Sequence, residues 1–172
     1  MIVVTDTSVV LNLSRLGLER LLREMFGEIL APPSVAVEFR RLAGLDKRFF
    51  GLVFPPFILI VVPAHVAPGL SGNQKLHAGE IDALSLAASQ MADAVLIDEI
   101  AGRAAAAGLG LRCIGILGLL IQAKNSGLIA AVGPVLNDLE IKAGFWMAPS
   151  LRRRVLNMVN EHDELGNPPE PF

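Results

Sequence analysis

The chain has little cysteine and little charge. Its 172 residues include one cysteine, Cys113, which excludes a disulfide framework and favours a reducing, cytoplasmic setting. Only 19% of the residues are charged, and 15 basic against 17 acidic side chains give a net charge of −2. This balance argues against a general polyanion-binding protein, whose affinity depends on many basic contacts. The balance is compatible with a protein that binds an anionic substrate at one site, through bound metal ions.

The chain also lacks a basic N-terminal region and an unbroken apolar span. Residues 1–6 are too short and too uncharged for a secretory signal, so we expect none. The longest uncharged stretch, residues 51–74, contains four prolines and is therefore a poor spanning helix. Yet 52% of the residues are hydrophobic and the mean hydropathy is +0.52, which excludes a disordered chain. We attribute this apolar content to a sheet that is buried on both faces.

Short apolar runs alternate with helical stretches. Continuous runs of this kind are typical of parallel strands covered on both sides, and they predict strands at residues 2–5, 29–31, 58–62, 94–97 and 111–114. Helices are predicted at residues 8–15, 18–26, 34–42, 78–91, 99–107, 116–126, 132–143 and 150–161. This alternation predicts a three-layer α/β fold. We expect a single domain over residues 1–162, an irregular insertion near residues 44–56 and a disordered tail at residues 163–172.

Two acidic residues follow predicted strands directly. Asp6 comes after the first strand, and Asp98 comes after the fourth. In open parallel α/β sheets, functional sites form beyond the carboxyl ends of the strands. A helix N-cap would explain either residue without any function, so both interpretations stay open at this point.

Three further acids come from predicted helices. Glu38 has Val37 and Phe39 as neighbours, and an acid among core residues needs a partner. Glu80 and Asp82 lie in the first helical turn, where the helix dipole stabilises carboxylates. If the acids converge, protonation or bound cations must relieve their repulsion. Oxygen ligands favour Mg²⁺ or Mn²⁺ over zinc, and a pair of such ions suits phosphodiester hydrolysis.

Together these residues resemble the PIN-domain family, and most closely its toxin-like prokaryotic branch. The resemblance covers about residues 1–145 and rests on VVTDTSVV at residues 3–10, Glu38, GEIDALSLA at residues 79–87 and Asp98. An uncharacterised subgroup of the branch is similar further downstream, at Arg103, Gly108, Leu109, Gly115, Lys124, Gly127, Leu128 and Ile129. The resemblance implies a parallel sheet of order 3-2-1-4-5, in which Asp6 and Asp98 follow neighbouring strands. It also implies a Mg²⁺- or Mn²⁺-dependent ribonuclease that acts on single-stranded RNA.

The resemblance also implies roles for individual residues. Asp6, Glu38, Asp98 and either Glu80 or Asp82 would be the catalytic acids that bind the metal. The hydroxyl of Thr7 or Ser8 would steer a water molecule or a phosphate oxygen. Asp82 fits the wider family and Glu80 fits the subgroup, but residues two apart do not share a helical face.

The chain departs from the family pattern near the fourth acid. Ile97 stands where the family usually has threonine, and Glu99 adds a second acid. Arg103 would either neutralise these acids, hold a phosphate or lie on a solvated helix face. None of the three histidines shows ligand spacing, so we interpret them as loop or surface residues: His65, His77 and His162.

The same branch implies partners. The expected function is that of the toxin in a toxin–antitoxin pair, or a relative of one, with an antitoxin protein as partner and a homodimer as assembly. The alternative is a PIN-like module that has lost activity and serves in oligomerisation or partner binding. We expect Phe145 and Trp146 to anchor the last helix to the core, and the Arg152–Arg154 run either to be solvated or to contact RNA or an acidic partner helix.

Overall fold

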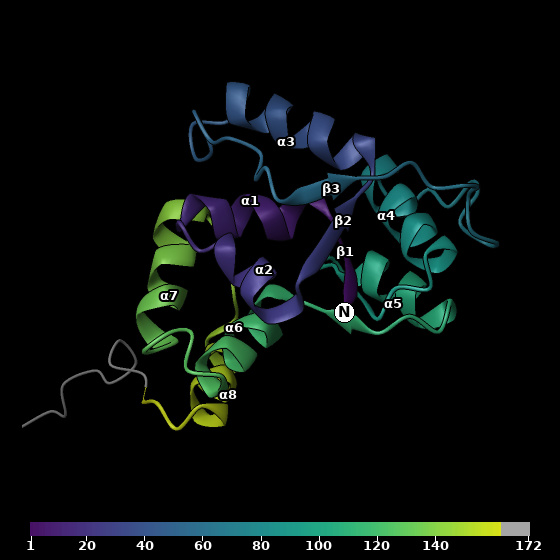
Figure 1. Ribbon diagram of the computed structural model, residues 1–172. Helices are drawn as coiled ribbons and strands as arrows, with labels where there is room; N and C mark the ends of the chain where they lie inside the picture. The colour runs from purple at the N-terminus through teal and green to yellow at the C-terminus, as the bar shows by residue number, and fades with distance from the viewer. Residues whose placement is uncertain (163–172) are drawn as a thin grey trace, which may run out of the picture.

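The computed structural model describes residues 1–162 and has an α/β architecture (Figure 1). Its sheet has five parallel strands in the order β3-β2-β1-β4-β5. This result confirms the predicted fold class and strand order. The strands are β1 (Ile2–Thr5), β2 (Glu28–Ala31), β3 (Ile58–Ile60), β4 (Ala94–Leu96) and β5 (Cys113–Ile114).

Every predicted helix has a counterpart within a few residues of its predicted bounds. The helix expected at residues 132–143 is an α-helix that continues as a π-helical turn, η1. The irregular insertion is shorter than predicted, because α3 runs on to Leu45. The helices are α1 (Thr7–Arg15), α2 (Arg20–Phe26), α3 (Pro33–Leu45), α4 (Ala78–Ser89), α5 (Ile100–Gly108), α6 (Ile116–Asn125), α7 (Gly133–Asp138), η1 (Leu139–Ala143) and α8 (Pro149–Met158).

The apolar core forms two layers, one on each face of the sheet. Successive strand residues point to opposite faces, so Val3 lies in one layer and Val4 in the other. The layer around Val4 contains Leu84 of α4 and Ala106 of α5. The larger layer around Val3 contains side chains of α1, α2, α3, α6, α7 and α8. The sheet is thus the middle of three layers, as the hydropathy pattern predicts.

The expectation that the whole sheet is buried on both faces is wrong at β3. Ile58 is buried, but Leu59 and Ile60 are 50% and 44% exposed. β3 pairs only with β2, so it is an edge strand with an uncovered side.

One of the two expected anchors of the last helix is also wrong. Phe145 is half-buried and packs against the larger core layer, but Trp146 is 81% exposed. Adjacent side chains in a non-helical segment point in different directions, and only Phe145 points inward here.

Within residues 1–162, no helix is both long and apolar enough to cross a membrane. The predicted disordered tail, residues 163–172, lies outside the described part of the chain.

Candidate active site

The sheet order brings Asp6 and Asp98 to the same edge. β1 and β4 are neighbours with Thr5 opposite Leu96, and the Asp6 amide donates a hydrogen bond to the Leu96 carbonyl at 3.0 Å. Asp6 is also the N-cap of α1, because its Oδ1 accepts from the Val9 amide at 3.0 Å. The capping role and the position at the strand end therefore belong to the same side chain.

The Asp6 carboxyl group is difficult to ionise in this position. Its side chain is 3% exposed, and this burial raises its pKa to about 8. Hydrogen bonds from the Val9 amide and the Ser8 hydroxyl oppose the rise in pKa, whereas the charges of Asp98 and Glu80 add to it. A cation beside Asp6 would relieve both the burial cost and the repulsion.

Glu38 reaches the same region from α3. The Thr7 hydroxyl donates to Glu38 Oε2 at 2.9 Å and links α1 to α3. The start of α4 lies close by, because a Cβ on Gly79 would be 3.3 Å from that oxygen. Glu38 is half-buried, with Arg41 Nη2 3.9 Å from its other oxygen. The hydrophobic neighbours in sequence point elsewhere: Phe39 is buried in the core and Val37 is 62% exposed.

Of the two candidate acids on α4, Glu80 is the one that faces this region. It is 5% exposed, and its Oε2 accepts from the His77 amide at 2.9 Å. Its Oε1 is buried and has no hydrogen-bond partner in residues 1–162. Burial raises the Glu80 pKa, and the charges of Glu99 and Glu38 add to this effect. Asp82 lies about 200° further around the helix and is not among the residues that line the pocket described below.

Asp98 follows β4, the strand next to β1, and its side chain bonds to the start of α6. Its Oδ1 accepts from the Ile116 amide at 2.7 Å, at the start of α6. Its Oδ2 is buried, and no partner for it exists in the described chain. Burial raises the Asp98 pKa to about 6, whereas the Ile116 hydrogen bond and the nearby Arg103 oppose the rise. A Cβ on Gly115 would lie 2.7 Å from Asp98 Oδ1 and 2.8 Å from Arg103 Nη1, so the guanidinium is close to this carboxylate.

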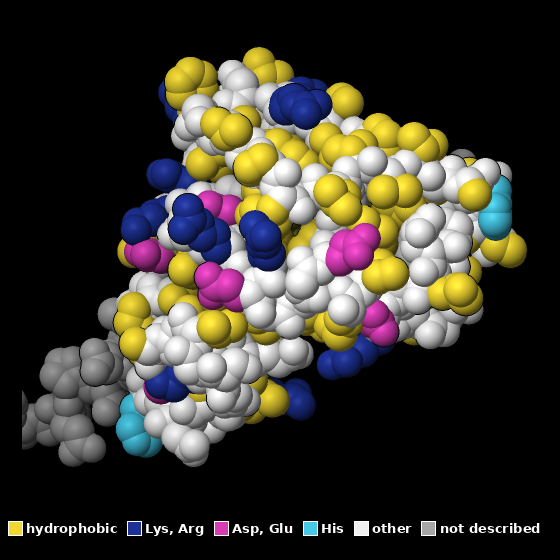
Figure 2. Space-filling view, in the orientation of Figure 1, with side chains coloured by type: hydrophobic (Ala, Val, Ile, Leu, Met, Phe, Trp, Pro, Cys, Tyr) yellow, Lys and Arg dark blue, Asp and Glu magenta, His cyan; other side chains and the backbone are white. Residues whose placement is uncertain are grey.

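The acids open into a pocket with two chemically different walls. One wall is acidic and carries the residues already described, whereas the other is mainly apolar, with Arg48 and Asn12 as its polar members. Figure 2 shows acidic and basic side chains lying close together on one face of the molecule. The acidic wall consists of Asp6, Thr7, Ser8, Glu38, His77, Gly79, Glu80 and Glu99, and the opposite wall of Leu11, Asn12, Leu42, Arg48, Phe49, Ala143, Gly144 and Phe145. Asp98 does not line the pocket, but its charge adds to the rise in the pKa of Asp6.

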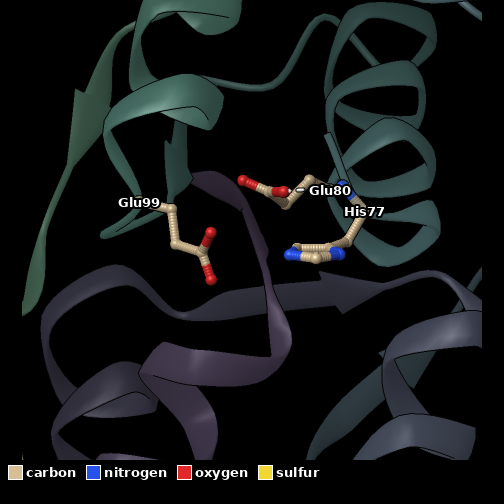
Figure 3. A group of neighbouring side chains, drawn as sticks. All are labelled: His77, Glu80 and Glu99. Atoms are coloured by element: carbon tan, nitrogen blue, oxygen red, sulfur yellow. Dashed lines mark hydrogen bonds between the residues drawn. The ribbon is translucent and has the colours of Figure 1, made fainter. Parts of the chain in front are cut away.

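Two titratable residues that line the pocket are absent from the site predicted from the sequence. His77 was interpreted as a loop or surface residue, and it is exposed, but its ring lies beside Glu80 and Glu99 (Figure 3). Its position three residues before Glu80 was a usable signal. Arg48 lies in the segment predicted to be irregular, and no feature of the sequence connects it with the acids.

A PIN-domain family model matches residues 2–161 of the chain. The chain belongs to the PIN-domain family. No curated protein and no solved structure matches it significantly. PIN domains are generally nucleases that use divalent metal ions, so this PIN domain has a nuclease fold.

The residues of this PIN domain fit a divalent cation. Two buried carboxylate oxygens, Glu80 Oε1 and Asp98 Oδ2, have no hydrogen-bond partner in residues 1–162, and both acids add negative charge around the buried Asp6. Carboxylate oxygens are the usual ligands of Mg²⁺ and of Mn²⁺. The acidic wall is therefore a candidate metal centre.

Proposed function

We propose that this PIN domain is a Mg²⁺- or Mn²⁺-dependent ribonuclease that hydrolyses phosphodiester bonds of single-stranded RNA. The observation that carries the proposal is the buried Asp6, which shares its surroundings with Glu80 and Asp98 and is costly to ionise without a cation. A divalent cation bound there supplies Lewis-acid activation of a phosphate group and of the attacking water.

The residues of the chain have separate roles in this proposal. Asp6, Glu38 and Glu80 would hold the metal, and Asp98 would add negative charge close to Asp6. The Ser8 hydroxyl donates to both oxygens of Asp6, at 3.0 and 3.1 Å, and so fixes the orientation of that carboxylate. The Thr7 hydroxyl does the same for Glu38.

The opposite wall supports an RNA substrate. Arg48 is held in place by an ion pair of 2.6 Å with Asp46 and by a hydrogen bond of 3.4 Å to the Ala143 carbonyl. An arginine fixed in this way is a suitable partner for a phosphate group. Phe145, which is half-buried, lines the same wall, and aromatic side chains stack on the bases of single strands.

We further propose that the protein is the toxin of a toxin–antitoxin pair, or a relative of one, and that it forms a homodimer. Exposed apolar side chains on α3 and β3 support an apolar contact with a protein partner: Val37, Leu45, Leu59 and Ile60. Sedimentation of the purified protein over a range of concentrations tests the homodimer.

The function is tested by measuring the cleavage rate of labelled single-stranded RNA in the presence of Mg²⁺ or Mn²⁺. The comparisons are the same reaction with a chelator and the same reaction with duplex RNA. Glu80→Gln is expected to lower the cleavage rate by about 100-fold or more, because even residues that only orient metal ligands contribute about 10- to 100-fold. Asp82→Asn is the matched control on the same helix and is expected to retain the wild-type rate. Absence of metal-dependent cleavage in the wild type would favour the alternative, an inactive module.

Arg48→Ala is expected to weaken RNA binding by about 10-fold or more, since a hydrogen bond to a charged group contributes roughly 1.5–3 kcal/mol. The measurement is the fluorescence of Trp146, which follows the pocket residue Phe145 and is the only tryptophan in a chain without tyrosine. Arg112→Ala, an exposed position just before β5 and outside the pocket, serves as control. Equal weakening by both substitutions would contradict a specific phosphate contact at Arg48.

A further inference from the structure

Three side chains at the acidic end of the pocket converge on one point. His77, Glu80 and Glu99 each offer a ligand atom, and these atoms lie within 4.8 Å of one another. In Figure 3 the imidazole of His77 and the carboxylate of Glu99 lie on the same side of Glu80 and face the space between them. The three residues come from the start of α4 and the start of α5.

The unpartnered oxygen of Glu80 is a separate observation that points to a ligand at this place. The Glu80 side chain is 95% buried, since its exposed fraction is 5%, and its Oε1 has no hydrogen-bond partner among the described residues. This oxygen lies on the α5 side, because a Cβ on Gly102 would be only 2.5 Å from it. In Figure 3 it points toward the side from which Glu99 approaches, whereas the other oxygen bonds to the His77 amide.

Glu99 is also available to a ligand. It occupies the N-cap position of α5 but makes no capping hydrogen bond within residues 1–162. An acid at this position often accepts from the backbone of the first turn. Here its carboxylate lies with Glu80 and His77 instead, where a bound cation would relieve the repulsion between the two carboxylates.

We propose that His77, Glu80 and Glu99 form a mixed nitrogen and oxygen site that binds a divalent transition-metal cation in preference to Mg²⁺. Mg²⁺ takes oxygen ligands and loses its water reluctantly, whereas imidazole is a good ligand for first-row transition metals. The inference rests on the proposed function, because this site lies on the acidic wall beside Asp6. It adds one histidine and one glutamate to the acids expected from the family resemblance, and it assigns the class of ion.

The test measures pulsed electron paramagnetic resonance spectra of the untagged protein after addition of Mn²⁺ alone, in the absence of RNA. The wild type is expected to show ¹⁴N coupling from a directly bound imidazole. His77→Gln is expected to lose this coupling and to bind Mn²⁺ about 10- to 100-fold more weakly, with Mg²⁺ affinity changed less than about twofold. His65→Gln, another exposed histidine, is the control and is expected to behave as the wild type.

A negative wild-type spectrum is decisive by itself, so a variant that fails to fold does not leave the proposal untested. Absence of ¹⁴N coupling in the wild type would overturn it. So would coupling that persists in His77→Gln, or equal weakening of Mn²⁺ and Mg²⁺ binding. Because the spectra require no substrate, a positive result together with absent RNA cleavage would count against the nuclease proposal and leave the metal site standing.

Discussion

Replacement of Asp6 by asparagine is expected to abolish metal-dependent RNA cleavage without unfolding the protein. Asparagine is as good an N-cap as aspartate, so the hydrogen bond from the Val9 amide to the side chain is retained. The variant loses the negative charge that would bind the cation and one of the two oxygens that accept from the Ser8 hydroxyl. We expect a fall in cleavage rate of roughly 1,000-fold, which corresponds to about 4 kcal/mol of transition-state stabilisation.

The same substitution is expected to change how stability depends on pH. In the metal-free protein, burial raises the pKa of Asp6 from 3.8 to about 8. Between these two values the folded state keeps a proton that the unfolded chain has lost, so stability falls as pH rises from about 4 to 8. Asp98, whose pKa burial raises to about 6, contributes in the same direction over the lower part of this window. Asp6→Asn removes the larger contribution.

The metal-free variant is therefore expected to be more stable than the wild type at pH 8, by on the order of 5 kcal/mol at most, and to differ little at pH 4. Urea denaturation at the two pH values in the presence of a chelator measures this difference. Mn²⁺ is expected to restore the stability of the wild type at pH 8, since it stabilises the ionised acids, and to have less effect on the variant. If the stability of the wild type and of Asp6→Asn depended on pH in the same way, ionisation of Asp6 would not destabilise the protein.

Asp6→Ala separates the charge from the helix cap. This variant lacks both, so it is expected to be about 1 kcal/mol less stable than Asp6→Asn at every pH. Its cleavage rate is expected to be as low as that of Asp6→Asn.

Gly102→Ala is expected to destabilise the protein and to disturb the metal centre at once. A Cβ at this position would lie 2.5 Å from Glu80 Oε1 and 2.6 Å from Ile97 Cγ2. Both neighbours are buried, Ile97 completely, and so neither can move easily. Overpacking of this kind costs about 1–3 kcal/mol, which outweighs the gain of up to about 1 kcal/mol from alanine in a helix. Displacement of Glu80 is expected to weaken Mn²⁺ binding as well.

Gly108→Ala provides the matched control on the same helix. A Cβ there would meet no heavy atom within 4 Å. We therefore expect unchanged or slightly higher stability and unchanged Mn²⁺ binding. Urea denaturation and Mn²⁺ titration of both variants measure the difference in stability and in Mn²⁺ affinity. If Gly102→Ala matched Gly108→Ala in both measurements, the short distance from Gly102 to Glu80 and Ile97 would be unimportant.

The sequence by itself was sufficient for the elements of the fold and for much of the acidic set. Strands and helices follow from short-range hydropathy patterns, and the acids at the ends of β1 and β4 are next to those patterns. The strand order came from resemblance, which links residues across the chain in a way that local periodicity does not. β3 is the instructive error, because a run of five apolar residues looks the same whether its strand lies inside the sheet or at its edge.

Tertiary structure alone decided which side chains meet. Glu80 and Asp82 are equivalent in the sequence, and only the packing of α4 against the sheet turns Glu80 toward Asp6 and Asp82 away. His77 and Glu99 are 22 positions apart and meet because α4 and α5 begin at the same edge of the sheet. Arg48 lines the pocket next to Ala143, a residue 95 positions further along the chain whose carbonyl accepts a hydrogen bond from it. Local patterns predict elements, whereas a site depends on the distances between elements, which long-range packing determines.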